Sequence, residues 1–380
     1  MRTPFPAAVA AAAVALTGAI VAGPAAEPAH AVGLMTRPYV NDPDAVGAND
    51  IRYLVHDRFD AASAGSLVRV NSWNISDTYV TDAMIDAHRR GVNVRVIMAR
   101  TNCNADLVAA LGTNQTRRSW ILCATGSTRG PGGTMHQKSL TFSSTGGSDH
   151  VTIVGSANLT EESWRDQWVD MFQFADRKDV YDAYNEVFAV QKLDDDASQN
   201  YFTASFNGGV GRANFYPVED PTPDAGDDPV VDRLAGLPSN ADTTIYVANY
   251  AFFGPRGAWI ADRLIAKKQA GATVHVITGP PSGDDLEARL QDAGIPVTRA
   301  FDASCAGADH VELSCNYIHL KAMTATYVEG GVRRYRTFTG SDNWALNALS
   351  ADEVTHRIGG RATHDAYVEL FRTIEARYGA

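Results

Sequence analysis

Apolar and polar residues alternate in two pairs of short segments that lie about 180 residues apart. In the first half of the chain these segments are residues 67–70 and 94–97, and in the second half they are 244–247 and 274–277. A period of two predicts half-buried β-strands. The repeated offset indicates a duplicated unit, and this repeat determines the fold that the sequence predicts.

Helical patterns repeat at the same offset. A helix that ends at Arg90-Gly91 corresponds to one that ends at Ala270-Gly271. Short helices are predicted at 105–111 and 284–292, and amphipathic closing helices at 178–191 and 363–377. Each half is therefore predicted as strand, helix, strand, helix, a strand pair and a closing helix. This is an α/β fold of two pseudo-symmetric halves with mixed, largely parallel sheets packed together.

The first 31 residues differ from the rest of the chain. An apolar, Ala-rich run at 7–23 is followed by Ala29-His30-Ala31, which predicts a secretory signal peptide over 1–31 and a secreted, extracellular protein. The alternative interpretation is an uncleaved membrane anchor.

The predicted organisation continues with a first half at 32–217 and a second half at 231–380. Between them, the acidic, Pro-rich segment 218–230 is predicted as a surface linker.

Composition and charge exclude some classes of protein. The 380 residues are 45% hydrophobic and 20% charged, which is typical of a globular protein. The net charge of −11 argues against a broad basic face and so against nucleic acid as a partner, although it allows a local basic pocket. No feature of the sequence indicates an obligate protein partner.

Four cysteines follow the predicted signal peptide, so three pairings are possible. One pair falls in each half at matching places, which favours Cys103–Cys123 and Cys305–Cys315. Their spacings do not fit a zinc ribbon, and no structural metal is predicted.

One constellation of chemical groups occurs twice. His136 and Lys138 are followed by Gly-Ser-x-Asn at 155–158, and His319 and Lys321 by Gly-Ser-x-Asn at 340–343. Residues i and i+2 of a strand point to one face, so each His and Lys pair is expected to face one pocket.

Together the two copies suit a phosphodiester. Two lysines and two amides bind the anionic oxygens, one imidazole attacks phosphorus, and the other protonates the leaving oxygen. This chemistry needs no metal and no cofactor. The predicted catalytic residues are His136, His319, Lys138 and Lys321, and the predicted phosphate-binding residues are Asn158, Asn343, Ser156 and Ser341.

These motifs resemble the phospholipase D superfamily, whose motif is His-x-Lys-x4-Asp with a downstream Gly-Ser-x-Asn. The resemblance covers the chain after residue 31, and implies two such halves with the active site between them. By analogy, His136 becomes a phosphohistidine and His319 acts as acid and then base, an order that the sequence does not fix. The chain departs from the motif because Ser143 and Thr326 replace both aspartates.

The resemblance also implies a carboxylate after each Gly-Ser-x-Asn that orients an imidazole through Nδ1. Glu353 fits this role in the second half. In the first half Asp166 and Asp170 compete, and Asp170 is favoured.

Three functions follow as hypotheses. The first is a secreted phospholipase D that releases phosphatidic acid from phospholipid at a membrane or micelle surface, with headgroup exchange when an alcohol captures the intermediate. The second is a nuclease of the same superfamily, and the third is a catalytically reduced protein that binds phosphate headgroups. Aromatic residues near the motifs either line a substrate channel or belong to the core: Trp73, Trp164, Trp168, Tyr250, Phe252, Phe253 and Trp344.

Overall fold

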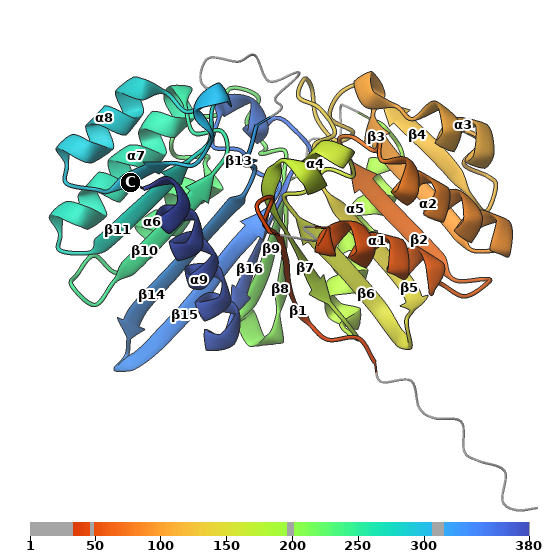
Figure 1. Cartoon of the computed structure of the whole chain (residues 1–380), viewed down its shortest axis with the longest axis horizontal. Helices are drawn as coiled ribbons and strands as arrows, with labels where there is room; N and C mark the ends of the chain where they lie inside the picture. Colours follow the sequence, from red (N-terminus) through yellow and green to blue (C-terminus); the bar gives the residue numbers. More distant parts are fainter. Residues whose placement is uncertain (1–32, 46–48, 196–200, 306–314, 380) are drawn as a thin grey trace, which may run out of the picture. The chain divides into compact units, whose positions relative to one another are not determined.

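The computed structural model describes residues 33–379 except 46–48, 196–200 and 306–314. The predicted signal peptide lies outside the described residues. Two eight-stranded sheets form the framework, one for each half of the repeat (Figure 1).

The first sheet has the strand order β1-β7-β6-β5-β2-β3-β4, and β13 also pairs with β7. Its strands are β1 (Arg37–Asn41), β2 (Leu67–Ser72), β3 (Asn93–Ala99), β4 (Trp120–Ala124), β5 (Ser139–Thr145), β6 (Ser148–Gly155), β7 (Gln167–Phe174) and β13 (Tyr317–Ile318).

The second sheet has the order β12-β11-β10-β14-β15-β16-β9-β8. Its strands are β8 (Phe202–Phe206), β9 (Gly211–Phe215), β10 (Thr244–Asn249), β11 (Thr273–Thr278), β12 (Val297–Arg299), β14 (Lys321–Glu329), β15 (Val332–Gly340) and β16 (Val354–Gly359).

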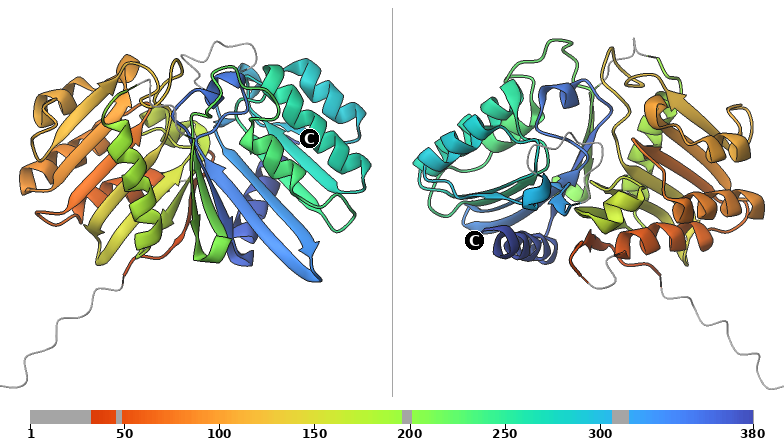
Figure 2. Two further views of the ribbon diagram at one scale, coloured as in Figure 1. Left: turned by 180° about the vertical axis from the view of Figure 1, so that it is seen from behind. Right: turned by 45° about the horizontal axis from the view of Figure 1, so that its top comes forward.

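Helices cover both faces of each sheet, as the two views of Figure 2 show. They are α1 (Asp50–Asp60), α2 (Thr78–Arg90), α3 (Ala105–Leu111), α4 (Glu161–Arg165), α5 (Lys178–Gln191), α6 (Pro229–Ala235), α7 (Gly254–Gln269), α8 (Asp284–Asp292) and α9 (Arg361–Tyr378).

The predicted α/β fold class with mixed sheets is confirmed, although antiparallel strand pairs outnumber parallel ones in both sheets. Parallel pairing occurs in β2-β3-β4 and in β10-β11-β12, where helices connect the strands. The remaining strands of each sheet pair antiparallel, apart from β13 with β7. The predicted ranges of α3, α5 and α8 are the observed ones, and α9 extends the predicted closing helix by two residues at its start and one at its end.

Three apolar clusters hold these layers together. One joins α1, α2 and α3 to the first sheet, and another joins α6, α7 and α8 to the second sheet. The third packs α5 and α9 between the sheets and combines residues such as Phe172 and Tyr184 with Leu320, Ile358 and Phe371. The two halves therefore share a core.

The division between the halves differs from the prediction. Strands β8 and β9 precede residue 217, yet β9 pairs with β16 in the second sheet. The predicted linker is exposed over most of 219–227, but its ends are buried at Val218 and Asp228. Asp228 caps α6 by accepting a hydrogen bond from the Val230 N–H at 2.9 Å. The acidic residues of this segment therefore have two roles: most belong to a solvent-exposed connection, whereas Asp228 caps a helix.

The structure pairs the cysteines within each half, as predicted. The Cα atoms of Cys103 and Cys123 are 5.7 Å apart, and those of Cys305 and Cys315 are 5.9 Å apart. Within the described part of the chain, no helix combines the length and apolar character that a membrane span requires.

Candidate active site between the two halves

Each His-x-Lys segment is held by the opposite half of the molecule. The backbone N–H of His136 donates to Asp352 O at 3.0 Å, and the N–H of His319 donates to Trp168 O at 2.9 Å. Both segments are extended chain that leads into a strand: β5 begins at Ser139 and β14 at Lys321. The site therefore forms only where the halves meet.

His136 has a carboxylate partner from the second half. Its Nδ1 atom lies 2.6 Å from Oε1 of Glu353, which is 1% exposed. Glu353 thus orients the first-half imidazole through Nδ1, across the interface between the halves. The ring of Trp73 packs edge-on against that imidazole, with the ring centres 5.8 Å apart.

His319 has a different environment. Its Nδ1 atom lies 3.1 Å from the backbone oxygen of Ser156. An imidazole protonated at Nδ1 donates a hydrogen bond to that oxygen. The ring of Tyr250 lies 4.6 Å from the imidazole, centre to centre, and also 4.8 Å from Nζ of Lys321. This imidazole is held by a carbonyl and an aromatic ring.

Strand register explains why only one histidine has a carboxylate. Asp352 and Trp168 are equivalent positions, since each accepts from the histidine N–H of the other half. The following residue is Glu353 in the second half and Val169 in the first. A buried valine therefore stands where the second half presents its carboxylate.

Asp170, the predicted first-half carboxylate, lies one residue beyond this position. Successive side chains of a strand point to opposite faces, and Asp170 accepts hydrogen bonds from Ser156 Oγ at 2.7 Å, from Thr339 Oγ1 and from Tyr367 OH at 2.5 Å. These partners join the two halves beneath the site. Its competitor Asp166 pairs with Arg165, so neither aspartate bonds to His319 among the described contacts.

The two lysines are buried beside the imidazoles. Lys138 and Lys321 donate from Nζ to the backbone oxygens of His136 and His319, at 2.7 and 2.8 Å. Burial lowers the pKa of Lys138 to about 7, with Glu353 opposing the shift. Burial and then the charge of Lys138 lower the pKa of Lys321 well below its usual value. Two like charges desolvated together form a site prepared for an anion.

The same environment sets the charge of the other titratable groups. Burial, and then Lys138 and Lys321, lower the pKa of His136 well below 6.5, and burial followed by the same lysines lowers that of His319. Burial raises the pKa of Glu353 to about 8, against the opposing charge of Lys138. At neutral pH both imidazoles are therefore neutral in the unliganded protein.

Each Gly-Ser-x-Asn loop carries an amide oxygen that is free to bind a ligand. The buried Oδ1 atoms of Asn158 and Asn343 have no hydrogen-bond partner among the described residues. The hydroxyl oxygens of Ser156 and Ser341 instead accept from the backbone N–H groups of Asp170 and Val354, at 2.9 and 3.0 Å. These serines fasten each loop to the next strand, and a phosphate contact from them stays a prediction.

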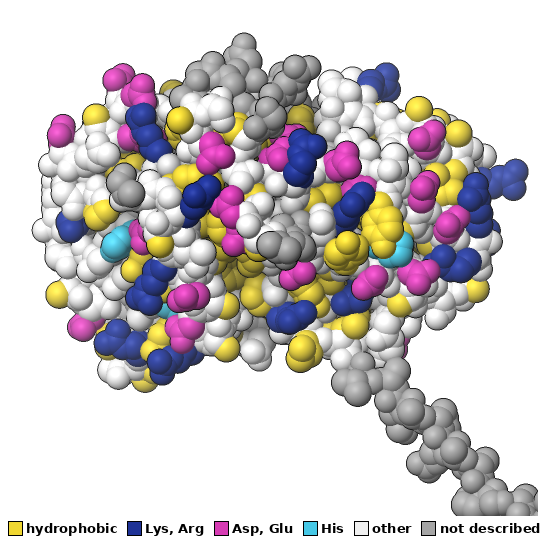
Figure 3. Space-filling view, viewed as in Figure 1, with side chains coloured by type: hydrophobic (Ala, Val, Ile, Leu, Met, Phe, Trp, Pro, Cys, Tyr) yellow, Lys and Arg dark blue, Asp and Glu magenta, His cyan; other side chains and the backbone are white. Residues whose placement is uncertain are grey.

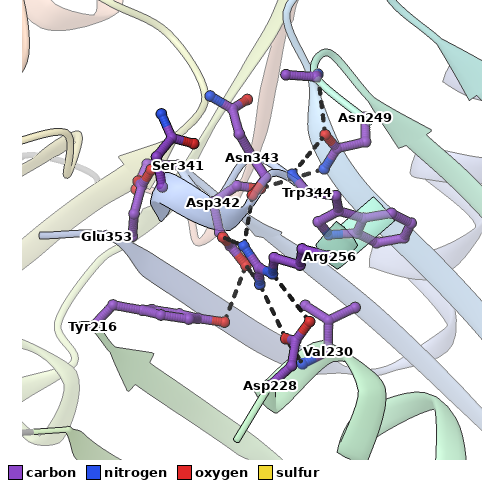
Figure 4. Close-up of polar contacts among 12 residues, drawn as sticks. Tyr216, Asp228, Val230, Asn249, Arg256, Ser341, Asp342, Asn343, Trp344 and Glu353 are labelled. Atoms are coloured by element: carbon purple, nitrogen blue, oxygen red, sulfur yellow. Dashed lines mark hydrogen bonds and ion pairs between the residues drawn. The ribbon is translucent and has the colours of Figure 1, made fainter. Parts of the chain in front are cut away.

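The sequence did not predict a buried ionic network that lies beside the second Gly-Ser-x-Asn loop. Arg256 lies between Asp228 and Asp342 and donates to both, and to the backbone oxygen of Asn343 at 2.6 Å (Figure 4). Tyr216 donates to the same Asp342 at 3.0 Å. The signal that was available is Asp342 itself, an ionisable residue at the variable position of the motif. The first copy has Ala157 there.

A cavity of about 570 Å³ opens beside His136 and Glu353. Trp73, Tyr250 and Phe253 line it, together with Pro281 and several alanines. The other four aromatics of the predicted cluster, Phe252, Trp164, Trp168 and Trp344, are buried in the protein interior. The core interpretation therefore holds for these four, and a substrate channel lined by the other three stays a prediction.

The two positions that depart from the motif lie away from the imidazoles. Ser143 Oγ accepts from the Leu67 N–H at 2.8 Å, and Thr326 Oγ1 lies 2.7 Å from Nε2 of His364. Five residues of strand separate Ser143 from Lys138, a distance of about 17 Å. These hydroxyls bond to neighbouring elements of the fold. Among the described residues, no three His, Cys, Asp or Glu side chains gather as a metal site would require.

Comparisons with known proteins agree with this architecture. Residues 59–191 match a family model described as cardiolipin synthase, PLD-like domain. The fold is similar to phosphatidylserine synthase of Haemophilus influenzae Rd KW20, with a TM-score of 0.56, 12% identity, and coverage of 86% of this chain and 84% of that one. No curated protein matches the sequence.

A second solved structure, polyphosphate kinase from Porphyromonas gingivalis, has a TM-score of 0.53 and 12% identity. The match covers 89% of this chain and 50% of the kinase, so this chain spans about half of that protein. At such identities the likeness concerns the fold alone.

Two α/β halves that exchange His-x-Lys segments across a shared core define a duplicated, phosphodiesterase-type fold. With the match of residues 59–191 to a PLD-like domain, this confirms the predicted resemblance to the phospholipase D superfamily.

Proposed function

We propose that this protein is a phospholipase D that hydrolyses the distal phosphodiester of a phospholipid through a phosphohistidine. The observation that carries the proposal is the buried convergence of two neutral imidazoles and two lysines beside an apolar cavity. The lysines bind the phosphate oxygens, and the apolar wall accommodates the lipid-like part of the substrate.

His136 is the nucleophile in this proposal. When Glu353 is ionised, its carboxylate accepts the Nδ1–H of His136 and leaves the Nε2 lone pair free to attack phosphorus. The new Nε2–P bond forms as the bond from phosphorus to the headgroup oxygen breaks.

His319 gives its proton to that leaving oxygen. Burial and the lysines lower its pKa in the empty site, whereas the negative charge of a bound phosphodiester offsets the lysines and raises it. In the second step His319 takes a proton from water, whose oxygen attacks phosphorus. The Nε2–P bond then breaks, which releases phosphatidic acid and restores His136.

Relatives and surface charge support a lipid over a nucleic acid. The family model that residues 59–191 match is described as cardiolipin synthase, PLD-like domain, and cardiolipin is a lipid. On the face in Figure 3, Lys and Arg side chains are interspersed with Asp and Glu and do not form a stripe. Binding to a polyanion depends on a concentrated basic surface. The two disulfides support our further proposal that the protein is secreted, since such bonds persist in oxidising compartments.

The test compares three substrates with purified disulfide-bonded protein and EDTA: phosphatidylcholine in mixed micelles, a chromogenic phosphodiester, and plasmid DNA. We expect headgroup release and cleavage of the chromogenic diester, both abolished in His136→Ala and retained in the control His56→Ala. Cleavage of DNA without headgroup release would replace the proposal with a nuclease. Silence on all three substrates would favour a headgroup-binding protein.

A further inference from the structure

A second cavity, distinct from the candidate active site, gathers four arginines on one face of the second sheet. Its volume is about 360 Å³, and it lies between α6 and strands β9, β14, β15 and β16. Arg212, Arg233, Arg336 and Arg357 line it. None of these four belongs to the His-x-Lys or Gly-Ser-x-Asn motifs.

Strand register places these side chains together. Arg357 of β16 is paired with Arg212 of β9 on one side and with Phe338 of β15 on the other. Arg336 precedes Phe338 by two residues and so shares its face. Like charges directly opposite each other in a sheet are destabilising, so the arrangement has a cost in the absence of a counter-charge.

The fourth arginine approaches from the helix above. The guanidinium carbon of Arg233 lies 4.5 Å from the centre of the Phe338 ring. Phe338 thus forms an apolar floor of the cavity beneath the guanidinium group of Arg233. Tyr327 of β14 also lines the cavity.

The protein supplies little compensation for this charge. In the part of the chain that the structure describes, none of the four arginines forms an ion pair. Arg212 donates to Asn214 Oδ1 at 3.1 Å, and Arg336 and Arg357 donate to backbone oxygens. Asp227 and Asp232 lie at the cavity but are exposed.

Unused donors point to a missing partner. Buried nitrogens without a hydrogen-bond partner among the described residues are Nη2 of Arg233, Nε of Arg336 and Nε of Arg357. Burial and then the charges of Arg336 and Arg212 lower the pKa of Arg357. Buried guanidinium donors left unpaired are costly, and a bound anion removes that cost.

We propose that this cavity is a second anion site that binds a phosphate-bearing ligand. A phosphate offers several acceptor oxygens and up to two charges, which suits converging planar guanidinium groups better than a single carboxylate does. The phosphate comes either from free phosphate or from a lipid phosphomonoester such as phosphatidic acid. The site stands independently of the proposed phospholipase activity.

The experiment uses the double variant Arg212→Gln/Arg336→Gln. The control is Arg333→Gln, because Arg333 is an exposed arginine of β15, the strand that holds Arg336, and does not line the cavity. Inorganic phosphate is titrated by calorimetry into wild type, both variants and Lys321→Met, which weakens the candidate active site. We expect the double variant to bind one phosphate fewer per chain than wild type and Arg333→Gln. Equal numbers in wild type and the double variant would overturn the proposal.

Thermal stability provides a readout that does not depend on stoichiometry. Without phosphate the double variant should melt at a higher temperature than wild type, because arginine repulsion is relieved, and phosphate should raise its Tm less. A double variant that melts lower and gains as much from phosphate as wild type would refute the site.

Vesicles distinguish the two sources of phosphate. Phosphatidylcholine vesicles with phosphatidic acid are compared with vesicles that hold an equal fraction of phosphatidylglycerol, a diester. If the double variant binds phosphatidic acid vesicles more weakly than wild type does, and phosphatidylglycerol vesicles equally well, the phosphate comes from the lipid. Unchanged vesicle binding with the loss of one inorganic phosphate identifies free phosphate. If the protein proves to have no phospholipase activity, these binding experiments still test the second anion site, since none of them requires turnover.

Discussion

Replacing Lys138 by methionine should stabilise the protein while it abolishes activity. Met has nearly the length of Lys and carries no charge, so the substitution removes a buried ammonium without opening a large cavity. The pKa of Lys138 falls from 10.5 to about 7 in the folded protein. A shift of that size corresponds to about 5 kcal/mol of disfavoured charge.

The sign of the pH dependence follows from proton binding. Between about pH 7 and 10.5 the folded protein binds fewer protons at this site than the unfolded chain does, so its stability rises with pH there. Below pH 7 the full cost of the buried charge is present. At pH 9 about 2 kcal/mol of it remains. Loss of the hydrogen bond from Nζ to the His136 oxygen subtracts about 1 kcal/mol at either pH.

We therefore expect Lys138→Met to exceed wild type in free energy of unfolding by about 4 kcal/mol at pH 6 and by about 1 kcal/mol at pH 9. Urea denaturation of disulfide-intact protein at both values measures the difference. The surface substitution Lys178→Met serves as the control and should change stability by less than about 0.5 kcal/mol. A variant less stable than wild type at pH 6, or a difference independent of pH, would refute the reasoning.

Three further predictions concern the site. Because the pKa of Glu353 is about 8, the rate on a soluble diester should rise between pH 6 and 8 as the carboxylate ionises, and Glu353→Gln should lose activity and that pH dependence; a flat wild-type profile would argue against the pair. Val169→Glu places a carboxylate near His319, and should move the alkaline limb of the rate profile to higher pH; an unmoved limb would contradict the equivalence of the two strands. Arg256→Met leaves Asp228 and Asp342 buried and unpaired, and should cost about 3–5 kcal/mol in urea denaturation; a loss under about 1 kcal/mol would mean that they are neutralised in another way.

Local pattern predicted the repeated elements because short-range physics specifies them. The range of α3 matches, since Asn104 caps it by accepting from the Leu107 N–H and Gly112 follows its last residue. The two motifs were found because they recur at the same place in each half. Cysteine pairing followed from the same symmetry.

What the sequence did not reveal depends on contacts between distant segments. The partnership of Glu353 with His136 spans 217 residues and arises only because the halves exchange backbone contacts. Asp166 and Asp170 were candidates because the resemblance implies a carboxylate in this segment, whereas the strand register places Val169 at the position equivalent to Glu353. Arg256 belongs to no local pattern, since its partners approach from separate elements of the second half.

The exchange of His-x-Lys segments also makes this protein a natural two-fragment system. A chain divided between α5 and β8 would separate His136 from Glu353 and leave each fragment with an incomplete centre. Turnover by a mixture of the fragments would then report their association directly. The same geometry lets the two halves differ at equivalent positions, since Val169 of one fragment stands where the other carries Glu353.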